Sequence, residues 1–489
     1  MQQSILNSLT DKALFVEKNY IGGAWVSAKD GQVIEVDNPS TGEIIGIVPN
    51  CGSSETLDAI HAAEAAFPLW KKKTAAERAS IIERWHDLML EHRDDLARIM
   101  TFEQGKPFAE SKGEIGYGAS FVKWFAEEAK RTYGETIPAT VADRRIIVQK
   151  QPIGVVAAIT PWNFPNAMIT RKAAPALAAG CTIVIKPSEF TPFSALALGV
   201  LAERAGIPAG VFNIVTGDPV AVGGMITASS IVRKLSFTGS TRVGKILMAQ
   251  CAETVKRLSL ELGGNAPFIV FDDADIDLAI DGIMASKFRN GGQTCVCANR
   301  IYIQSGIHDA LVAKLADRTN ALKVGDGFAD GTEIGPMINE AALQKIESHI
   351  DDAVGKGGTL ITGGARLGAG SRLFKPAVVT GVTADMLVAN EETFGPVAPI
   401  FKFETEDQVI AAANDTRFGL AAYLFTNDLS RSFRVGEALE VGMVGLNVGA
   451  YATEVAPFGG VKESGLGHEG SHHGINEYLE MKVFHIGGI

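Results

Sequence analysis

Two hydrophobic patterns alternate along the middle of the chain. Short apolar runs such as G-V-V-A-A-I and T-I-V-I-K are followed by longer segments in which apolar residues recur at helical spacing. The first pattern predicts buried strands, and the second predicts helices that cover a sheet. The alternation is clearest from Gly154 to Gly264, where Gly180 follows one predicted helix at the position of a C-cap. We therefore predict an α/β fold in which a parallel sheet carries helices on both faces.

Polar or glycine-rich segments follow several of these predicted strands. They are T-P-W-N-F-P, K-P-S-E-F-T-P, V-T-G-D, F-T-G-S-T and E-L-G-G-N. The carboxyl ends of parallel strands meet at one edge of a sheet, and ligands of such sheets bind at that edge. We therefore expect a ligand site there. Because no G-x-G-x-x-G fingerprint follows any predicted strand, a dinucleotide site at this edge would be an unconventional one.

The pattern changes on either side of this region. A second α/β region begins near Leu262–Gly264, and a boundary between domains is expected there. Residues 75–130 have helical periodicity and many charges. Residues 132–150 contain two short strand-like runs around a polar turn, which predicts a hairpin. Because the hairpin interrupts an α/β pattern, we expect it to lie outside the domain and to contact a partner chain.

Composition limits the class of protein. The chain has 489 residues, too many for one ordinary core, and its formal net charge is −11. An excess of acidic residues argues against a general nucleic-acid or membrane-surface binder. We see no secretory signal and no apolar run long enough to cross a membrane. Five scattered cysteines do not form a disulfide framework, so a reducing, cytoplasmic setting is expected.

Three motifs imitate phosphate or metal sites but lack residues that such sites need. Gly239–Lys245 matches the core of a P-loop, yet Ile246 replaces the magnesium ligand. A turn that presents backbone N–H groups to a pyrophosphate is the favoured interpretation. The aspartates of Asp272–Asp277 resemble a calcium loop but are better explained as helix capping. The histidine pair in Gly470–Gly474 has no metal-ligand spacing, and we expect no metal site.

Cys295 and Glu261 are the candidates for catalytic chemistry. Cys295 follows Gly-Gly-Gln-Thr between a predicted helix and a predicted strand, where nearby backbone N–H groups would lower its pKa and provide oxyanion donors. Glu261 ends an apolar strand, so its carboxyl could act as a base with a raised pKa. Both residues also have structural interpretations, an inert core thiol and a capping carboxylate.

These segments together resemble the NAD(P)-dependent aldehyde dehydrogenase family, from about Tyr20 to Lys482. Seven segments carry the resemblance in the family's order: Pro161-Trp162-Asn163-Phe164, Lys186-Pro187-Ser188-Glu189, Phe237-Thr238-Gly239-Ser240, Glu261-Leu262-Gly263-Gly264, Gly292-Gln293-Thr294-Cys295, Glu392-Thr393-Phe394-Gly395-Pro396 and Pro457-Phe458-Gly459-Gly460.

The resemblance implies a mechanism and a set of site residues. Cys295 is expected to attack the aldehyde carbon. The amide of Asn163 and the backbone N–H of Cys295 are expected to stabilise the oxyanion, and Glu261 is expected to activate the hydrolytic water. The expected cofactor-binding residues are Trp162, Lys186, Ser188, Glu189, Gly217, Gly239, Ser240, Leu262, Glu392 and Phe394. Glu189 would repel a 2′-phosphate, which favours NAD, with NADP possible.

The resemblance also implies an architecture. Residues 1–131 and 151–262 are expected to form a Rossmann-like cofactor-binding domain, and residues 263–456 a second α/β domain that is catalytic. Residues 132–150 and 470–489 are expected to form a small β arm for oligomerisation. A homodimer or homotetramer is therefore expected.

Within the family the segments around Arg171 and Cys295 are most similar to those of succinate-semialdehyde dehydrogenases. This similarity implies that Arg171 and Arg289 bind the distal carboxylate of a small anionic aldehyde. The subfamily usually has a serine where this chain has Ala452, beside Thr453, and Tyr451 stands nearby. Because this departure reshapes the expected anion pocket, glutarate semialdehyde and sulfolactaldehyde remain alternative substrates. A structural ion pair is the alternative for either arginine.

Two further alternatives stay open. Cys297 lies two residues past the expected nucleophile, so a reversible Cys295–Cys297 disulfide could switch the enzyme off, although a small space-filling residue explains Cys297 equally well. A non-catalytic scaffold protein is an alternative of another class. Such a protein would be expected to have lost Cys295 or Glu261, and both are present.

Overall fold

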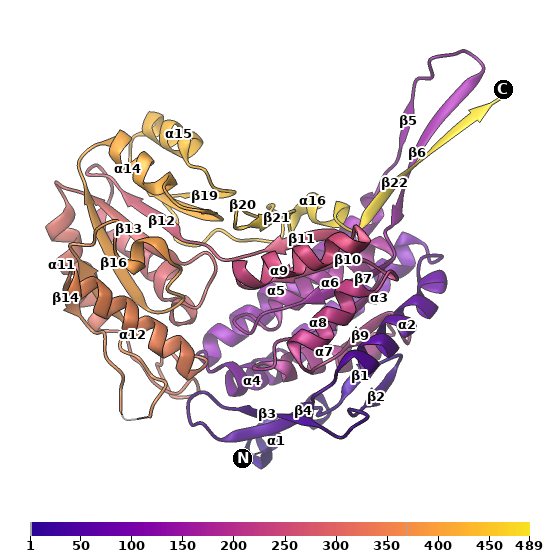
Figure 1. Ribbon diagram of the computed structural model, residues 1–489, viewed down its shortest axis with the longest axis horizontal. Coiled ribbons are helices and arrows are strands. Elements are labelled where there is room, and N and C mark those ends of the chain that lie inside the picture. The colour runs from indigo at the N-terminus through magenta and orange to yellow at the C-terminus, as the bar shows by residue number, and fades with distance from the viewer. Residues whose placement is uncertain (1, 369) are drawn as a thin grey trace.

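The chain folds into two α/β lobes and a projecting β arm. The computed structural model describes residues 2–368 and 370–489. Figure 1 shows the first half of the chain in one lobe and most of the second half in the other, with the C-terminus at the tip of the arm. No helix among the described residues is long and apolar enough to cross a bilayer. The predicted α/β fold is confirmed.

The first lobe is built on an eight-stranded sheet with the order β2-β1-β9-β8-β7-β10-β11-β21. Its strands are β1 (Asn19–Ile21), β2 (Ala24–Val26), β7 (Val155–Ile159), β8 (Thr182–Lys186), β9 (Phe212–Ile214), β10 (Val232–Thr238), β11 (Arg257–Glu261) and β21 (Gly465–Leu466). The five central strands, from β9 to β11, are parallel. The chain passes outward from β7 to β8 and β9 and then returns to place β10 on the other side of β7. Ligands of doubly wound sheets bind where the strand order reverses in this way.

Helices pack against this sheet and around its edge. They are α2 (Ser53–Trp70), α3 (Ala75–Glu91), α4 (Arg93–Gln104), α5 (Phe108–Glu128), α6 (Ala167–Ala179), α7 (Pro192–Arg204), α8 (Pro219–Ala228) and α9 (Thr241–Cys251). Helix α6 is buried along its whole length and ends at Gly180, which has the left-handed φ of +97° expected of a C-cap. The pattern does not predict α8, because Gly223 and Gly224 lower its helix propensity.

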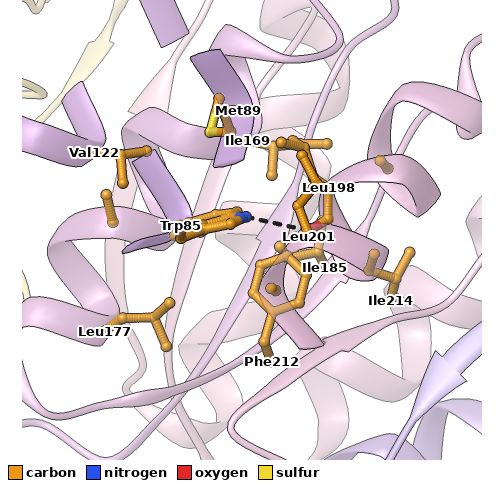
Figure 2. Close-up of a cluster of buried hydrophobic side chains, with 14 of the residues drawn as sticks. Trp85, Met89, Val122, Ile169, Leu177, Ile185, Leu198, Leu201, Phe212 and Ile214 are labelled. Atoms are coloured by element: carbon orange, nitrogen blue, oxygen red, sulfur yellow. Dashed lines mark hydrogen bonds between the residues drawn. The ribbon is translucent and has the colours of Figure 1, made fainter. Parts of the chain in front are cut away.

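Trp85 lies at the centre of the core between these helices and the sheet. Its side chain is fully buried, and its indole N–H donates to the carbonyl oxygen of Leu198 over 3.2 Å. Figure 2 shows aliphatic side chains from α5, α6, α7 and α3 around the ring, together with Phe212 from β9. The indole therefore joins three layers, because it contacts two helical layers and the sheet beneath them.

The second lobe is built on a seven-stranded sheet with the order β14-β15-β16-β13-β12-β18-β19. All its pairs are parallel except β14 with β15. Its strands are β12 (Ala266–Val270), β13 (Ala298–Gln304), β14 (Thr359–Thr362), β15 (Ala377–Thr380), β16 (Val397–Phe403), β18 (Ala421–Phe425) and β19 (Met443–Leu446). Its helices are α10 (Ile276–Ile283), α11 (His308–Asn320), α12 (Glu340–Gly355), α13 (Leu387–Asn390), α14 (Glu406–Asn414) and α15 (Leu429–Ala438).

Shorter elements complete the described chain. They are α1 (Gln2–Ser8), β3 (Val33–Asp37), β4 (Ile44–Pro49), β17 (Phe418–Gly419), β20 (Val461–Lys462), α16 (Ser471–Asn476), the 3₁₀ turns Lys12–Leu14, Ala129–Arg131, Ala252–Thr254 and Arg289–Gly292, and a π-helical turn at Met284–Phe288. Asp275 caps α10 by accepting from the backbone N–H groups of Asp277 and Leu278, which is the role predicted for the aspartate cluster.

The arm is a three-stranded antiparallel sheet with β6 in the middle. The predicted hairpin is present as β5 (Glu135–Ile137) and β6 (Arg144–Pro152), and β22 (Leu479–Gly487) pairs along the other edge of β6. Most of β22 is exposed, including Met481 at 72% and Val483 at 50%. The domain boundary expected near Leu262–Gly264 falls between β11 of one sheet and β12 of the other, and the domain assignment stays a prediction.

We expect Trp85→Ala to lower the free energy of unfolding of the first lobe by about 3–5 kcal/mol, because it removes a buried indole and leaves a cavity. Thermal unfolding followed by circular dichroism measures the change. Phe433→Ala is the matched control, since Phe433 on α15 is 62% exposed and should change stability by less than about 0.5 kcal/mol. Equal shifts for the two variants would contradict this account of the core.

Candidate active site

A cleft between the lobes collects eight of the seventeen predicted site residues. It lies at the carboxyl ends of β7, β10 and β11, where the strand order reverses. Its lining residues are Pro161, Trp162, Asn163, Phe164, Met168, Thr238, Gly239, Ser240, Leu262, Gly263, Cys295, Lys345, Glu392 and Phe394. Both lobes contribute, so the cleft brings together the candidate nucleophile and many of the expected cofactor-binding residues.

Cys295 stands on a loop whose backbone is held in an unusual conformation. Asn290, Gly291 and Gly292 all have positive φ, at +51°, +62° and +77°. Only glycine adopts this region freely, and a Cβ on Gly292 would lie 2.3 Å from the carbonyl oxygen of Gly395. The loop turns sharply after the π-helical turn and leaves the Cys295 side chain partly exposed at the cleft. The glycines of the motif are therefore required by the turn that presents the sulfur.

The pKa of Cys295 corrects one expectation from the sequence. Burial raises the pKa of the thiol to about 12, and the carboxyls of Glu392 and Glu261 add to the rise while the nearby Arg171 guanidinium opposes it. The expectation of a thiol pKa lowered by backbone N–H groups is therefore wrong for the free protein, because loss of hydration outweighs them. The sulfur carries its proton until a base removes it.

Asn163 is held on both its backbone and its side chain. Its carbonyl oxygen accepts from Lys106 Nζ at 2.6 Å and from Asn290 Nδ2 at 3.0 Å. Its amide nitrogen donates to the carbonyl oxygen of Gln293 at 2.9 Å, two residues before Cys295. An amide nitrogen carries two hydrogens, so one remains for a ligand in the cleft. This geometry suits a fixed hydrogen-bond donor.

Glu261 ends β11 with a buried side chain. Neither carboxyl oxygen has a hydrogen-bond partner among the described residues. Burial raises the pKa of Glu261 well above its usual value, the carboxylate of Glu469 raises it further, and the cations Arg171 and Lys172 act in the opposite direction. Glu261 is not among the residues that line the cleft, but it directly precedes Leu262, which is. A carboxyl with free lone pairs and a raised pKa is suited to accept a proton in such a site.

Arg171 takes part in a buried ion pair. Its Nε lies 2.7 Å from Glu469 Oε2, and the other oxygen of Glu469 contacts Lys172. The guanidinium carbon lies 4.0 Å from the ring centroid of Phe458. Arg171 therefore forms the structural ion pair that is the alternative to substrate binding. One of its groups, Nη2, is nevertheless buried without a hydrogen-bond partner among the described residues, so it retains a donor for a ligand.

Arg289, Ala452 and Thr453 line a second pocket on the other side of the Cys295 loop. Thr294 and Val296, which flank the candidate nucleophile Cys295, also line this pocket, so the pocket lies next to the Cys295 loop. The other lining residues are Ala285, Ser286, Tyr423, Gly449, Ala450 and Tyr451. Tyr451 packs against Tyr423 at 5.3 Å between ring centroids. The pocket therefore combines an exposed guanidinium with aromatic walls.

Glu392 and Phe394 lie on one loop of the second lobe that faces the first. Glu392 accepts from the backbone N–H of Gly264 at 3.1 Å, and burial raises its pKa to about 7. Phe394 has a positive φ of +55° and meets Trp162 edge-on at 5.5 Å between ring centroids. Across the cleft, Ser240 caps the N-terminus of α9 by accepting from the backbone N–H of Val243.

The remaining cofactor candidates lie at the same edge of the sheet but outside the residues that line the cleft. Lys186 ends β8, and its Nζ lies 3.3 Å from Glu189 Oε2. Ser188, which lies between these two residues in the sequence, has a buried side chain. Gly217 follows β9 and has a structural explanation. A Cβ there would lie 2.0 Å from the carbonyl oxygen of Cys51, so backbone packing alone requires glycine.

Cys297 is fully buried, and its sulfur faces Lys287 in the π-helical turn that follows α10. Lys287 Nζ donates to the sulfur at 3.2 Å, and the thiol contacts the Lys287 carbonyl oxygen at 3.5 Å. Both Cys295 and Cys297 are free thiols in the structure. The proposed regulatory disulfide stays a prediction.

Sequence reasoning missed several residues that line the cleft. Phe164, Met168 and Thr238 are close neighbours of predicted site residues and could have been found from their adjacency. Lys345 on α12 belongs to no recognised segment, yet its Nζ donates to the carbonyl oxygen of Glu392 at 2.5 Å. A helix that is remote in sequence gives no local signal of such a contact.

Several known proteins of similar sequence are named as dehydrogenases of small anionic aldehydes. The chain is 59% identical to a glutarate-semialdehyde dehydrogenase of Pseudomonas aeruginosa, with 98% of this chain and 100% of that protein covered. It is 60% identical to the NADP(+) succinate-semialdehyde dehydrogenase of Escherichia coli, with 98% and 99% covered. It is 59% identical to a 3-sulfolactaldehyde dehydrogenase of Pseudomonas putida, with 98% and 99% covered.

A solved structure and a family profile agree with these sequence relationships. A crystal structure of aldehyde dehydrogenase from Brucella melitensis biovar abortus superposes with a TM-score of 0.97 at 60% identity, covering 99% of both chains. Residues 25–484 match the profile of the Aldehyde dehydrogenase family. With Cys295 and the fixed amide of Asn163 lining one cleft of this fold, and Glu261 buried directly before the lining residue Leu262, the chain belongs to the aldehyde dehydrogenase family.

Proposed function

We propose that this enzyme oxidises a small aldehyde with a distal anionic group to the carboxylate, with succinate semialdehyde as the preferred candidate. The observation that carries the proposal is the position of Cys295, between a cleft lined by Ser240 and Glu392 and a pocket lined by Arg289. Cys295 lines the cleft, and its chain neighbours Thr294 and Val296 line the pocket that contains Arg289. The non-catalytic scaffold alternative is set aside, because the relatives of the chain are enzymes over nearly its full length.

The chemistry follows from the residues around the sulfur. Glu261 accepts the thiol proton, and the thiolate of Cys295 attacks the aldehyde carbon to form a carbon–sulfur bond. The amide of Asn163 donates to the resulting oxyanion. When the oxyanion collapses, the hydrogen on carbon departs as hydride and a thioester remains on Cys295. Glu261 releases the first proton to solvent and then removes a proton from water, which attacks the thioester carbon. When the carbon–sulfur bond breaks, the carboxylic acid is released and the proton on Glu261 returns to the Cys295 thiolate.

A nicotinamide dinucleotide bound in the cleft supplies the hydride acceptor. The residues present fit such a group. The N-terminus of α9 at Ser240 offers backbone N–H groups to a pyrophosphate, and the carboxyl of Glu392 can accept from ribose hydroxyls. Glu189, which is partly exposed, disfavours a 2′-phosphate when it faces the ribose, so we propose NAD with NADP as a second cofactor.

The anion is proposed to bind Arg289 and the free Nη2 of Arg171. A guanidinium binds a carboxylate or a sulfonate through charge-assisted hydrogen bonds. Ala452 lines this pocket and offers no hydroxyl, so length and head-group selectivity depend on shape and on the arginines. Glutarate semialdehyde and sulfolactaldehyde are the alternatives. Initial rates of NADH formation with these three aldehydes and with propanal rank them directly.

The arm supports a further proposal, that the enzyme is a homodimer or homotetramer. We propose the cytoplasm as its compartment on a separate ground, because its five cysteines are free thiols. A three-stranded sheet that projects from the body with exposed Met481 and Val483 buries little apolar surface by itself. A second copy of the chain against that sheet would cover it. Sedimentation velocity of the purified protein measures the assembly.

We expect Cys295→Ser to lower kcat for aldehyde oxidation by roughly 10³-fold or more, because an alcohol is a far weaker nucleophile than a thiolate. The affinity for NAD, measured by quenching of protein fluorescence, should stay within a few-fold. Oxidation at an undiminished rate in this variant would overturn the proposed function.

We expect Arg289→Ala to lower kcat/KM for succinate semialdehyde by about 10–100-fold, since one charge-assisted hydrogen bond contributes about 1.5–3 kcal/mol. Propanal, which has no distal charge, should be oxidised at an unchanged rate. Arg318→Ala is the matched control, because Arg318 is also an exposed arginine nearby but pairs with Asp281. An equal loss with both aldehydes would remove Arg289 from anion recognition.

We expect kcat at saturating cofactor to rise as the pH increases above the usual titration range of a carboxyl group. A raised pKa keeps the Glu261 carboxyl protonated at low pH, so its basic form grows as pH increases. Glu261→Gln should remove this rise and lower kcat by about 10²–10⁴-fold. Saturating cofactor is needed because Glu392, with a pKa of about 7, titrates in the same range. A variant that keeps both the rate and its pH dependence would exclude Glu261 as the base.

A further inference from the structure

A buried lysine outside the proposed mechanism contacts the backbone of the oxyanion donor. Lys106 lies in the loop between α4 and α5, and its side chain is 1% exposed. Its Nζ donates to Glu114 Oε2 at 2.5 Å and to the carbonyl oxygen of Asn163 at 2.6 Å. The ring of Phe164 covers the ammonium at 4.2 Å from its centroid. The Lys106 side chain is thus bonded to the backbone of the residue whose amide is the proposed oxyanion donor.

Such a charge is costly to bury. An ammonium and a carboxylate both lose their hydration, and their mutual attraction regains this loss only when further hydrogen bonds complete the geometry. An apolar pair of similar size would often stabilise a protein as well or better. Stability alone therefore gives a weak reason for the Lys106–Glu114 pair, and the contacts that the two side chains make beyond each other point to another reason.

Glu114 holds the other end of the segment that contains Asn163. Its Oε1 accepts from the backbone N–H groups of Asn166 and Ala167 at 3.0 and 3.2 Å. These groups begin α6, and the side chain of its N-cap residue, Asn166, makes no capping hydrogen bond. Glu114 therefore replaces the missing cap. Lys106 and Glu114 together fix residues 163–167 at both ends.

The last residue of α4, directly before this loop, also fixes the turn that precedes Cys295. Gln104 Nε2 donates to Asn290 Oδ1 at 3.1 Å, and Gln104 Oε1 accepts from the backbone N–H of Lys106 at 2.9 Å. Asn290 Nδ2 in turn donates to the carbonyl oxygen of Asn163 at 3.0 Å. The carbonyl oxygen of Asn163 thus accepts hydrogen bonds both from Lys106 and from Asn290 in the loop that leads to Cys295. The oxyanion donor and the sulfur are held relative to each other through this oxygen.

We propose that Lys106 is a positioning residue for the oxyanion site, acting through the backbone of Asn163 and paired with Glu114 for that purpose. The inference rests on the proposed function, in which the Asn163 amide stabilises the oxyanion. Lys106 itself touches neither substrate nor cofactor. Its removal takes away one of the two hydrogen bonds that hold the Asn163 carbonyl oxygen, so the amide is placed less accurately against the reacting carbonyl. The loss therefore falls on the transition state and leaves the binding of the aldehyde nearly unchanged.

A double-mutant cycle in the full-length enzyme tests this. We expect Lys106→Met to lower kcat by about 10–100-fold with KM for succinate semialdehyde changed less than about 3-fold, and Asn163→Ala to lower kcat by about 10²–10³-fold. If Lys106 acts through Asn163, the double variant should be no slower than Asn163→Ala alone. Multiplied losses, or an unchanged kcat in Lys106→Met, would overturn the inference.

Two further variants separate positioning from folding. Lys234→Met is the matched control, because Lys234 is equally buried and ion-paired, with Glu477 at 3.3 Å, and should leave kcat within about 2-fold. If Lys106→Met does not fold, Lys106→Met combined with Glu114→Gln removes both charges and should fold with the same loss of kcat. An unchanged kcat in Asn163→Ala would instead overturn the role of Asn163 in the proposed function, which the cycle reports separately.

Discussion

The reversal of strand order beside β7 is the constraint on which the site depends. Because β7, β10 and β11 are parallel neighbours, the segments that leave their carboxyl ends meet at one edge. These segments carry Asn163, Ser240 and Glu261, which lie far apart in the sequence. The second lobe has only to bring one loop, with Cys295, against that edge. The candidate catalytic groups are thus positioned chiefly by sheet pairing, which is more rigid than the loops themselves.

Buried charge surrounds this edge on two sides. On one side Glu469 lies between Arg171 and Lys172 beneath Glu261, and on the other Lys106 pairs with Glu114 behind Asn163. Hydration is lost at each of these groups, yet each is neutralised by a partner rather than by protonation. Glu261, Cys295 and Glu392 differ from these pairs, because burial raises the pKa of each and the nearby cations oppose the rise only in part.

Much of the fold follows from local pattern, whereas parts of the site do not. The alternation of apolar runs and helical segments predicts the first sheet, and Gly180 marks the end of α6 as expected. The contact of Lys172 with Glu469 joins residues 297 positions apart, and no local pattern encodes it. The thiol pKa of Cys295 also depends on burial, which a glycine-rich loop does not reveal by itself. Gly217 shows the reverse case, since a glycine expected at a cofactor is required by the backbone of Cys51.

The meeting of Gly264 with the nucleophile loop has a mechanical consequence. A Cβ on Gly264 would lie 2.4 Å from the carbonyl oxygen of Cys295, so main chain rests on main chain at the junction of the two sheets. Side chains can change rotamer to absorb small shifts, but two abutting peptide backbones cannot. A shift of the segment that joins β11 to β12, and so links the two sheets, would therefore press directly on the loop that carries the sulfur.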